Sequence, residues 1–309
     1  MMEHKNIKSA INAPVLAGYW FGWPPQIDLA SIPIYNIIVV AFMQTGPDGI
    51  PTFSPLNMTD EEFTAAVNNL KREGCEVIIS LGGAGGLVSL TQNDKQAFID
   101  ETIRIVDKYG FTGFDIDLED VSILAADNQT VIPEALIEIK HHYLRQGKHF
   151  LITMAPQFTY LRGEDAPYIP YIKKLEGYYD LIFPQYYNHG ANGIWSDELG
   201  MWLSQNNNEY KGEFLYTLTH AIVTGTQEFI KIPADKFAIG LPASPSAAID
   251  GYVENPADVK YAFDRLDAEG HCIKGLMTWS VNHDAANGYR FAYNYAPLVY
   301  GRRNMCRPY

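Results

Sequence analysis

Cysteine is scarce in this chain, and its few cysteines show no pattern of pairing. Cys75, Cys272 and Cys306 are an odd number among 309 residues, and no C-x-x-C pair occurs. Disulfide frameworks use even numbers of cysteines, and structural zinc sites use closely spaced pairs. We therefore expect neither, and we expect Cys75 and Cys272, which open apolar strand-like runs, to be buried thiols.

Basic residues and long hydrophobic runs are also lacking. The chain has 23 Lys and Arg against 36 Asp and Glu, a formal net charge of −13. Without a Lys/Arg-rich block, nucleic acid and anionic membranes are poor candidates as partners, and a neutral substrate suits the surface better. No stretch approaches eighteen uncharged apolar residues, so no membrane span is expected. Residues 1–13 lack a signal-peptide pattern, and we expect a loose N-terminal segment there.

What the chain does contain is a regular alternation of apolar runs and amphipathic helical patterns. Continuous apolar runs suit parallel strands that are covered on both faces. Strands are expected at 14–20, 36–43, 75–81, 113–119, 149–155, 179–186, 237–241 and 272–279. Helices are expected after Thr59 and up to Gly74, then at about 93–109, 133–146, 256–269 and 284–295.

The spacing of helix ends indicates the architecture. Gly74, Gly110 and Gly147 each end a helix and begin a strand, and they lie 36 and 37 residues apart. Eight such units would need about 290 residues. We therefore predict an α/β fold, a single-domain (β/α)8 barrel over residues 1–309. The alternative, an open doubly wound sheet, would be expected to carry a Gly-rich phosphate loop after its first strand, and none is found.

Three carboxylates stand at alternate positions of the fourth expected strand. In a strand, Asp115, Asp117 and Glu119 would point to one face, about 6–7 Å apart, with Phe114 and Ile116 opposite. A solvated strand or a site for a hard cation would also explain such acids. However, they lie at the carboxyl end of an apolar strand, where α/β barrels place their catalytic residues.

The acidic stretch belongs to a set of motifs. Thr112-Gly-Phe-Asp-Ile-Asp-Leu-Glu119 resembles the D-G-x-D-x-D-x-E signature of the family 18 glycoside hydrolases, the chitinases and their relatives. Four further stretches resemble motifs of the same family in the same order: Ser80-Leu-Gly-Gly83, Thr153-Met-Ala-Pro-Gln157, Gln185-Tyr-Tyr-Asn188 and Met277-Thr-Trp-Ser280. Together the five cover nearly the whole chain.

The resemblance implies a retaining mechanism assisted by the substrate, in which the 2-acetamido oxygen of the sugar is the nucleophile. Glu119 would be the general acid and base, and Asp117 would orient the acetamido group. Asp115 would share a proton with Asp117, because two carboxylates that close cannot both ionise cheaply. Tyr187 would donate a hydrogen bond to the acetamido oxygen.

The resemblance also implies a set of substrate-binding residues. Trp279 would form the apolar floor under the reacting sugar, since the C–H groups of a pyranose pack well on an aromatic face. The other candidates are Gln185, Asn188, Met154, Gln157 and Tyr19. Trp20, Trp23 and Trp195 are candidate outer sugar platforms, and Ser80, Gly82 and Gly83 are expected to serve packing.

The sequence departs from the family pattern at one position and lacks one optional feature. Thr112 stands where the signature has its first Asp. In an extended strand its side chain would point to the opposite face from the three acids, so we expect it to be structural. Only about thirty residues separate Leu241 from Cys272, too few for the α+β insertion that walls the cleft of some relatives. We therefore expect an open cleft and endo-acting cleavage.

The expected activity is a chitinase acting on chitin or chito-oligosaccharides as a monomer, with no cofactor and no metal. An endo-β-N-acetylglucosaminidase that cleaves N-glycans would keep the same acids and stays an alternative. A non-catalytic chitin-binding lectin is a third reading, although such relatives typically lose the terminal Glu, and Glu119 is present. The sequence leaves localisation open, but a polymeric substrate would normally lie outside the cell.

Overall fold

The computed structural model describes residues 11–32 and 34–302, so residues 1–10 of the expected N-terminal segment, and Cys306, lie outside the described residues. Internal contacts divide the chain into two compact units. Unit 1 is Met1–Asn12, Trp20–Pro156 and Pro167–Leu181, and unit 2 is Ala13–Tyr19, Gln157–Ala166 and Ile182–Tyr309.

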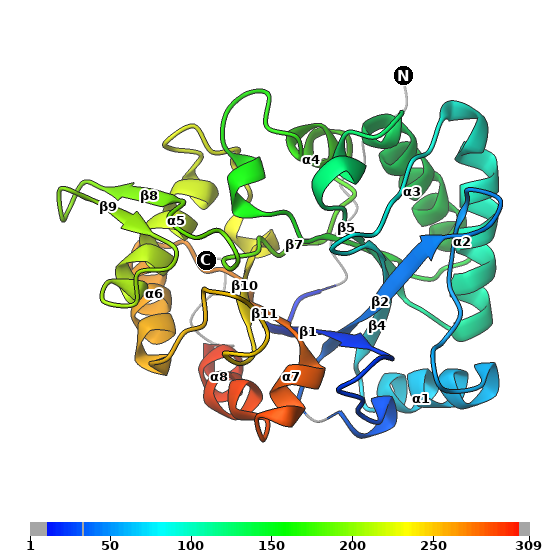
Figure 1. Cartoon of the computed structure of the whole chain (residues 1–309), viewed down its shortest axis with the longest axis horizontal. Helices are drawn as coiled ribbons and strands as arrows, with labels where there is room; N and C mark the ends of the chain where they lie inside the picture. The colour runs from blue at the N-terminus through cyan, green and yellow to red at the C-terminus, as the bar shows by residue number, and fades with distance from the viewer. Residues whose placement is uncertain (1–10, 33, 303–309) are drawn as a thin grey trace. The chain divides into compact units, whose positions relative to one another are not determined.

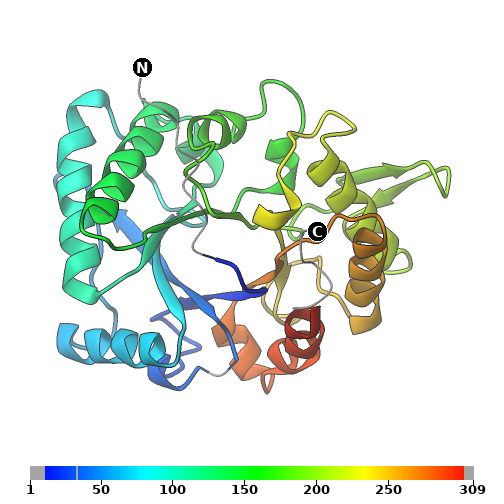
Figure 2. The same ribbon diagram turned by 180° about the vertical axis from the view of Figure 1, so that it is seen from behind.

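Unit 1 contains a run of parallel strands covered by helices. In spatial order the strands are β2 (Ile37–Thr45), β4 (Glu76–Gly82), β5 (Gly113–Asp117) and β6 (Leu151–Met154), and β3 (Pro51–Thr52) pairs antiparallel with β2. The helices are α1 (Asp60–Arg72), α2 (Lys95–Tyr109), α3 (Asn128–Arg145) and α4 (Ile169–Lys174). The views from the front and from behind both show α2 and α3 side by side, on the outside of these strands (Figures 1 and 2).

Unit 2 repeats the pattern with shorter strands. Parallel pairs join β10 (Ala238–Pro242) to β11 (Gly275–Trp279), and β11 to the first residues of β1 (Val15–Phe21). Isolated parallel bridges link Ile182 at the end of β7 (Leu181–Ile182) to Phe237, and Gln185 to Gly240. The helices are α5 (Lys211–Thr224), α6 (Pro256–Ala268), α7 (Val281–Ala286) and α8 (Arg290–Gly301).

Local chemistry explains where the elements begin and end. Thr59 and Glu62 form the expected reciprocal capping box at the start of α1. Gly110 ends α2 in the left-handed conformation at φ 77°, where a side chain would be unfavourable. Strand β5 is buried at every position, as expected of a strand covered on both faces. The eight parallel strands of the described residues, alternating with helices, confirm the predicted (β/α)8 fold class.

Several details differ from the prediction. Helix α3 begins at Asn128, before the expected start at Pro133, and the Asn128 side chain ties this end to a neighbouring loop by accepting from Leu90 N–H and donating to the Val88 carbonyl. The expected last helix is split into α7 and α8, where Tyr289 takes the left-handed conformation. Cys75 is buried as predicted, but Cys272 is only half-buried because β11 begins three residues later.

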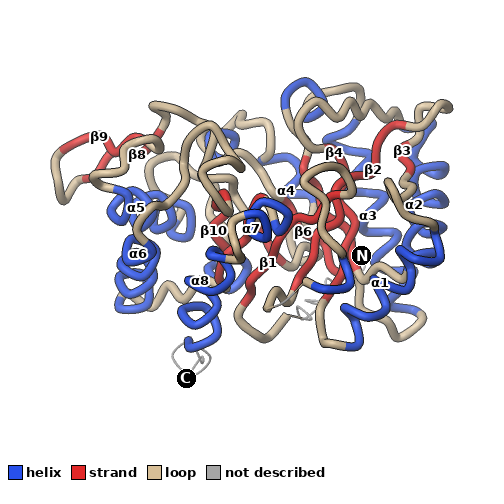
Figure 3. Tube along the Cα trace, turned by 60° about the horizontal axis from the view of Figure 1, so that its bottom comes forward, coloured by secondary structure: helices blue, strands red, loops and turns tan. Residues whose placement is uncertain are grey.

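Three elements in the second half of the chain were not predicted. They are α4, α5 and a two-stranded antiparallel hairpin of β8 (Gly193–Ser196) and β9 (Met201–Ser204). The hairpin lies against α5 (Figure 3). Among the described residues, none of the helices is long and apolar enough to cross a membrane.

A buried ion pair fixes α3 to the strand region of unit 1. The Lys140 ammonium donates to Asp180 Oδ2 at 2.6 Å and to the Tyr178 carbonyl at 2.6 Å. Asp180 Oδ2 also accepts from the backbone N–H of Ile152 in β6 at 2.9 Å. Both side chains of the pair are 4% exposed, so neither charge can be solvated if its partner is removed.

Replacement of Lys140 by Met should therefore leave Asp180 as an uncompensated buried charge. We expect the free energy of unfolding, measured by urea denaturation, to fall by about 3–5 kcal/mol. The matched control is Lys95→Met, which removes a partly exposed lysine paired with Glu134 and Glu138 and should cost about 1 kcal/mol or less. Equal effects of the two substitutions would contradict this assignment.

Candidate active site

Asp115 is the most deeply placed acid of unit 1. Its carboxylate is fully buried, and both of its oxygens accept hydrogen bonds from hydroxyl groups on the adjacent strands. Ser80 of β4 donates to Oδ2 at 2.7 Å, and Thr153 of β6 donates to Oδ1 at 2.5 Å. The register places both donors directly beside Asp115. Hydrogen bonds of this kind offset the desolvation cost of a buried carboxylate.

Asp117 follows on the same face of β5 and is 4% exposed. Its carbonyl oxygen accepts a hydrogen bond from Gly83 N–H at 2.8 Å. A Cβ atom on Gly82, which has φ 113°, would lie 2.4 Å from that oxygen. Only glycine therefore allows the end of β4 to approach Asp117 so closely, and this confirms a packing role for Gly82.

Glu119 lies just past the end of β5 and is partly exposed. Its backbone is still extended (φ −125°, ψ 163°), so the alternation of side chains continues beyond the strand. The buried Tyr168 hydroxyl supports this segment, accepting from Leu118 N–H at 3.0 Å and donating to the Ile116 carbonyl at 3.1 Å. Burial and the nearby Asp117 charge raise the pKa of Tyr168, so its hydroxyl keeps its proton.

An aromatic pocket of unit 1 adjoins the acidic strand; Trp20 and Trp23 were candidates from the sequence, whereas the pocket itself was not predicted. Its volume is about 290 Å³, and its lining includes Trp20, Trp23, Phe42, Phe53 and Leu56. Trp23 stacks on Phe21, with ring centroids 4.4 Å apart and planes 11° apart.

The Phe42 ring links this pocket to the acids. It packs directly on Gly83, where a Cβ atom would lie 2.3 Å from the ring. Gly83 in turn donates to the Asp117 carbonyl. Trp20 is 3% exposed and cannot present a face to solvent, whereas Trp23 is partly exposed.

Unit 2 carries the other group of predicted residues. Tyr187 and Gln185 are each 5% exposed. Gly251, at φ 97°, packs against Tyr187, since a Cβ there would lie 2.7 Å from both Cα and Cβ of the tyrosine. The buried Gln205 side chain accepts from His189 N–H at 2.9 Å and so holds the end of the same loop.

The remaining predicted residues occupy both units. Tyr19 and Trp279 of unit 2 have ring centroids 5.6 Å apart, and Trp279 is partly exposed. Gln157 and Gln185 form a parallel bridge. Asn188 is exposed, and its Oδ1 accepts from Ile249 N–H at 2.8 Å. Met154 of unit 1 is fully buried beside Ile116 of the acidic strand.

Thr112, which replaces the first Asp of the family signature, contacts the backbone of the neighbouring strand. Its hydroxyl lies 3.2 Å from both the N and the O of Val77 in β4, a structural role as expected. Trp195 is 44% exposed and lies opposite Trp202, which is 43% exposed, across the β8–β9 hairpin. Thr153 and Tyr168 hold the acidic strand, although this role was not predicted for either residue. Thr153 begins a recognised motif, whereas no local signal marks Tyr168.

Comparison with known proteins decides the family. Residues 15–251 match the family described as glycosyl hydrolases family 18. The chain belongs to this family. It is 44% identical to a chitinase of Enterococcus faecalis, over 92% of this chain and 88% of that protein. It is 30% identical to chitinase Chi52 of Paenibacillus xylanexedens over 93% of this chain, but it spans only 61% of that relative. The family and these relatives identify the chain as a glycoside hydrolase of the chitinase type.

Solved structures support the barrel fold. A family 18 chitinase from Chromobacterium violaceum superposes with a TM-score of 0.78 and 26% identity, covering 93% of this chain and 83% of that one. A xylanase and α-amylase inhibitor protein from Scadoxus multiflorus also matches, with a TM-score of 0.65 and 19% identity over 95% of this chain and 98% of that one. The second likeness concerns the fold alone, so the function must be argued from the side chains.

The close approach of Gly82 to Asp117 leads to a test. Gly82→Ala should displace the acidic strand and lower kcat on chito-oligosaccharides by at least about tenfold, since small misplacements of catalytic groups are costly. Gly85→Ala is the matched control: Gly85 also has a positive φ, 73°, but a Cβ there would meet nothing within 4 Å. Similar kcat values for the two variants, with both folded by circular dichroism, would argue against this role of Gly82.

Proposed function

We propose that this glycoside hydrolase is an endo-acting chitinase that cleaves β-1,4 bonds between N-acetylglucosamine units by a substrate-assisted, retaining mechanism. The observation that carries the proposal is the alternating row of Asp115, Asp117 and Glu119, in which the deepest acid is fully buried between two hydroxyl donors. A carboxylate on a solvated strand would be hydrated and would not need such buried donors.

The buried donors suggest how the acids divide their tasks. Two hydroxyl hydrogen bonds favour the anionic form of Asp115. The proton that the pair shares would then reside mainly on Asp117, and a carboxyl oxygen of Asp117 would accept from the acetamido N–H of the substrate and so orient this group. Glu119, the outermost and partly exposed acid, remains available to the glycosidic oxygen. Each of the three carboxyls thus has a different environment, as acid–base catalysis requires.

The reaction proceeds in two displacements at the anomeric carbon. First, the acetamido oxygen attacks this carbon, its bond to the glycosidic oxygen breaks, and Glu119 gives its proton to the leaving oxygen. The product is an oxazolinium ion. Water then attacks the anomeric carbon from the opposite side, Glu119 takes the proton of the water, and the acetamido group is restored. Two inversions retain the configuration.

Residues of unit 2 would hold the reacting sugar. Tyr187 would donate to the acetamido oxygen, and its tight packing on Gly251 fixes its position. Trp279 would be the apolar floor, with Tyr19 supporting its ring. Gln185, Asn188 and Gln157 would supply amides for sugar hydroxyls, and the fully buried Met154 would support the acidic strand from behind rather than touch the sugar.

Further sugars of the chain would use the aromatic pocket of unit 1. Trp23 and Phe42 offer faces on which pyranose rings pack, and Phe42 reaches the acidic strand through Gly83. The connection from β10 to β11 contains α6 and a loop but no added strand among its residues, all of which the structure describes. An unwalled site of this kind supports binding within long chains rather than at their ends.

The first test is turnover of defined chito-oligosaccharides by the parent chain and by Glu119→Gln. Loss of the general acid should lower kcat by about 10²–10⁴-fold or more, while binding of the oligomers is kept. Glu176→Gln, which alters an exposed glutamate on the surface, is the control and should keep parental activity.

The alternatives give other results in the same test. A parent that binds the oligomers but never cleaves them would be a lectin. A parent that ignores them but releases glycans from a glycoprotein would be an endo-β-N-acetylglucosaminidase. Either outcome would overturn the proposal.

The endo mode is tested separately on a soluble chitin derivative. Random internal cuts should lower the viscosity of the solution early, when few reducing ends have been released. A release of mainly disaccharide from crystalline chitin, with viscosity falling only in step with reducing ends, would show processive cleavage and contradict the endo assignment.

A further inference from the structure

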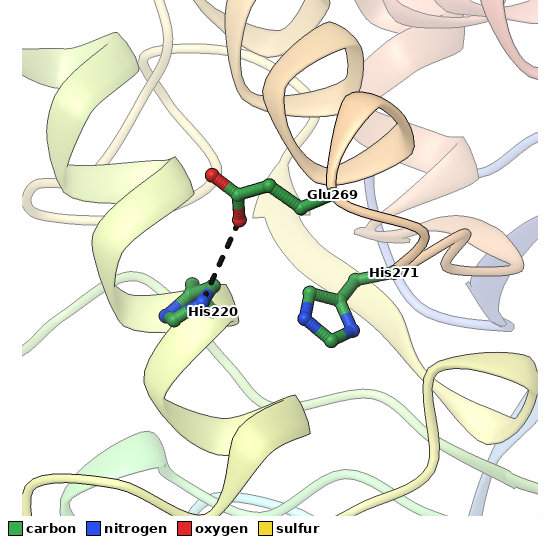
Figure 4. A group of neighbouring side chains, drawn as sticks. All are labelled: His220, Glu269 and His271. Carbon is green, nitrogen blue, oxygen red and sulfur yellow. Dashed lines mark ion pairs between the residues drawn. The ribbon is translucent and has the colours of Figure 1, made fainter.

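Three potential metal ligands converge in unit 2 where two helices end. His220 lies four residues before the end of α5, Glu269 is the C-cap residue of α6, and His271 follows two residues later (Figure 4). One ligand atom from each residue lies within 4.8 Å of the other two. His220 Nε2 and Glu269 Oε2 are 3.5 Å apart, and the two imidazole centroids are 5.5 Å apart.

We propose that His220, Glu269 and His271 form a binding site for a divalent transition-metal ion, with Zn²⁺ as the best match. Two imidazoles and one carboxylate are a typical zinc donor set, whereas Ca²⁺ and Mg²⁺ prefer oxygen ligands throughout. Ligand atoms of a tetrahedral zinc ion lie about 3.3 Å apart, given bond lengths of about 2.0–2.1 Å. The His220–Glu269 spacing already fits, and a ligand atom of the half-buried His271 lies within 4.8 Å of the other two.

The surroundings of Glu269 support a site rather than a chance encounter. Tyr216, one turn before His220 on α5, donates its hydroxyl to Glu269 Oε1 at 2.6 Å. This hydrogen bond leaves Oε2 directed at His220. Carboxylates that bind metals are generally fixed by such a second hydrogen bond.

Electrostatics at the end of α6 also favours a cation. The last carbonyl groups of this helix carry partial negative charge, and Glu269 is its C-cap residue. Arg265 on α6 is the opposing charge, but its guanidinium lies over the Tyr216 ring, and its Nη1 donates to Glu198 at 2.8 Å.

A metal ion here would join the end of α5 to the connection between α6 and β11. The site contains none of the residues proposed for catalysis, so the ion would stabilise the fold of unit 2 and take no part in the reaction. Without the ion, His220 and Glu269 remain an exposed pair of little energetic value. The expected effect of Zn²⁺ is therefore on thermal stability.

The experiment compares the melting temperature of the full chain, first treated with EDTA and then dialysed, with and without added ZnCl₂. We expect Zn²⁺ to raise Tm by several degrees, because an ion that binds only the folded state stabilises it by mass action. His271→Gln removes one ligand but keeps the His220–Glu269 pair, and should abolish the zinc-dependent increase. CaCl₂ at the same concentration should have no such effect.

His149→Gln is the matched control. His149 pairs with Glu76 at 3.1 Å and is partly exposed, like His220, but it lies outside the three-ligand cluster. This variant should keep the full zinc-dependent increase. The inactive Glu119→Gln variant should keep it too, which separates the metal site from the proposed chitinase function.

Two results would overturn the site. One is an unchanged Tm of the parent on addition of Zn²⁺. The other is an increase that His271→Gln retains or that His149→Gln loses. Titration with Co²⁺ gives an independent measurement that does not depend on unfolding. The visible absorption of bound Co²⁺ should appear with the parent and with His149→Gln, and its presence with His271→Gln would equally contradict the proposal.

Discussion

The placement of a charged group inside the β-strands of unit 1 is the constraint on which the site depends. Asp115 is fully buried, and an isolated carboxylate there would be prohibitively costly. Ser80 and Thr153, its direct neighbours on β4 and β6, supply hydroxyl hydrogen bonds to its two oxygens. The register of three strands must therefore be correct within one residue, because a slip would turn these hydroxyls to the other face.

Close packing of glycine residues against neighbouring segments is a second feature that positions the candidate site. Gly82 and Gly83 bring the end of β4 onto the Asp117 carbonyl, and Gly83 also receives the Phe42 ring. In unit 2, Gly251 allows its segment to pack closely against Tyr187. Each contact would be blocked by a single Cβ atom. Close backbone approach thus positions the candidate site together with the side-chain hydrogen bonds of Ser80, Thr153 and Tyr168.

Much of the fold and part of the site could be predicted from local patterns. The capping box at Thr59, the left-handed glycine at Gly110 and the apolar runs of β2 and β4 are properties of short segments, and they appear as predicted. Predictions from local sequence patterns were wrong or incomplete where tertiary packing outweighs local preference. The run at 179–186 forms only the two-residue β7, and the β8–β9 hairpin and α5 lie in a region with weaker periodicity.

By itself, the sequence determined the order of the eight parallel strands, the family and the row Asp115, Asp117 and Glu119. The row could be predicted because alternation along an extended strand is a local rule. Only the tertiary structure decided which side chains surround that row. Thr153, Tyr168 and Phe42 reach β5 or its glycine neighbour from segments distant in sequence. The His220, Glu269 and His271 cluster likewise forms because α5 and α6 pack together. Contacts between segments far apart in the chain carry no local signal, since they arise only when the core is buried.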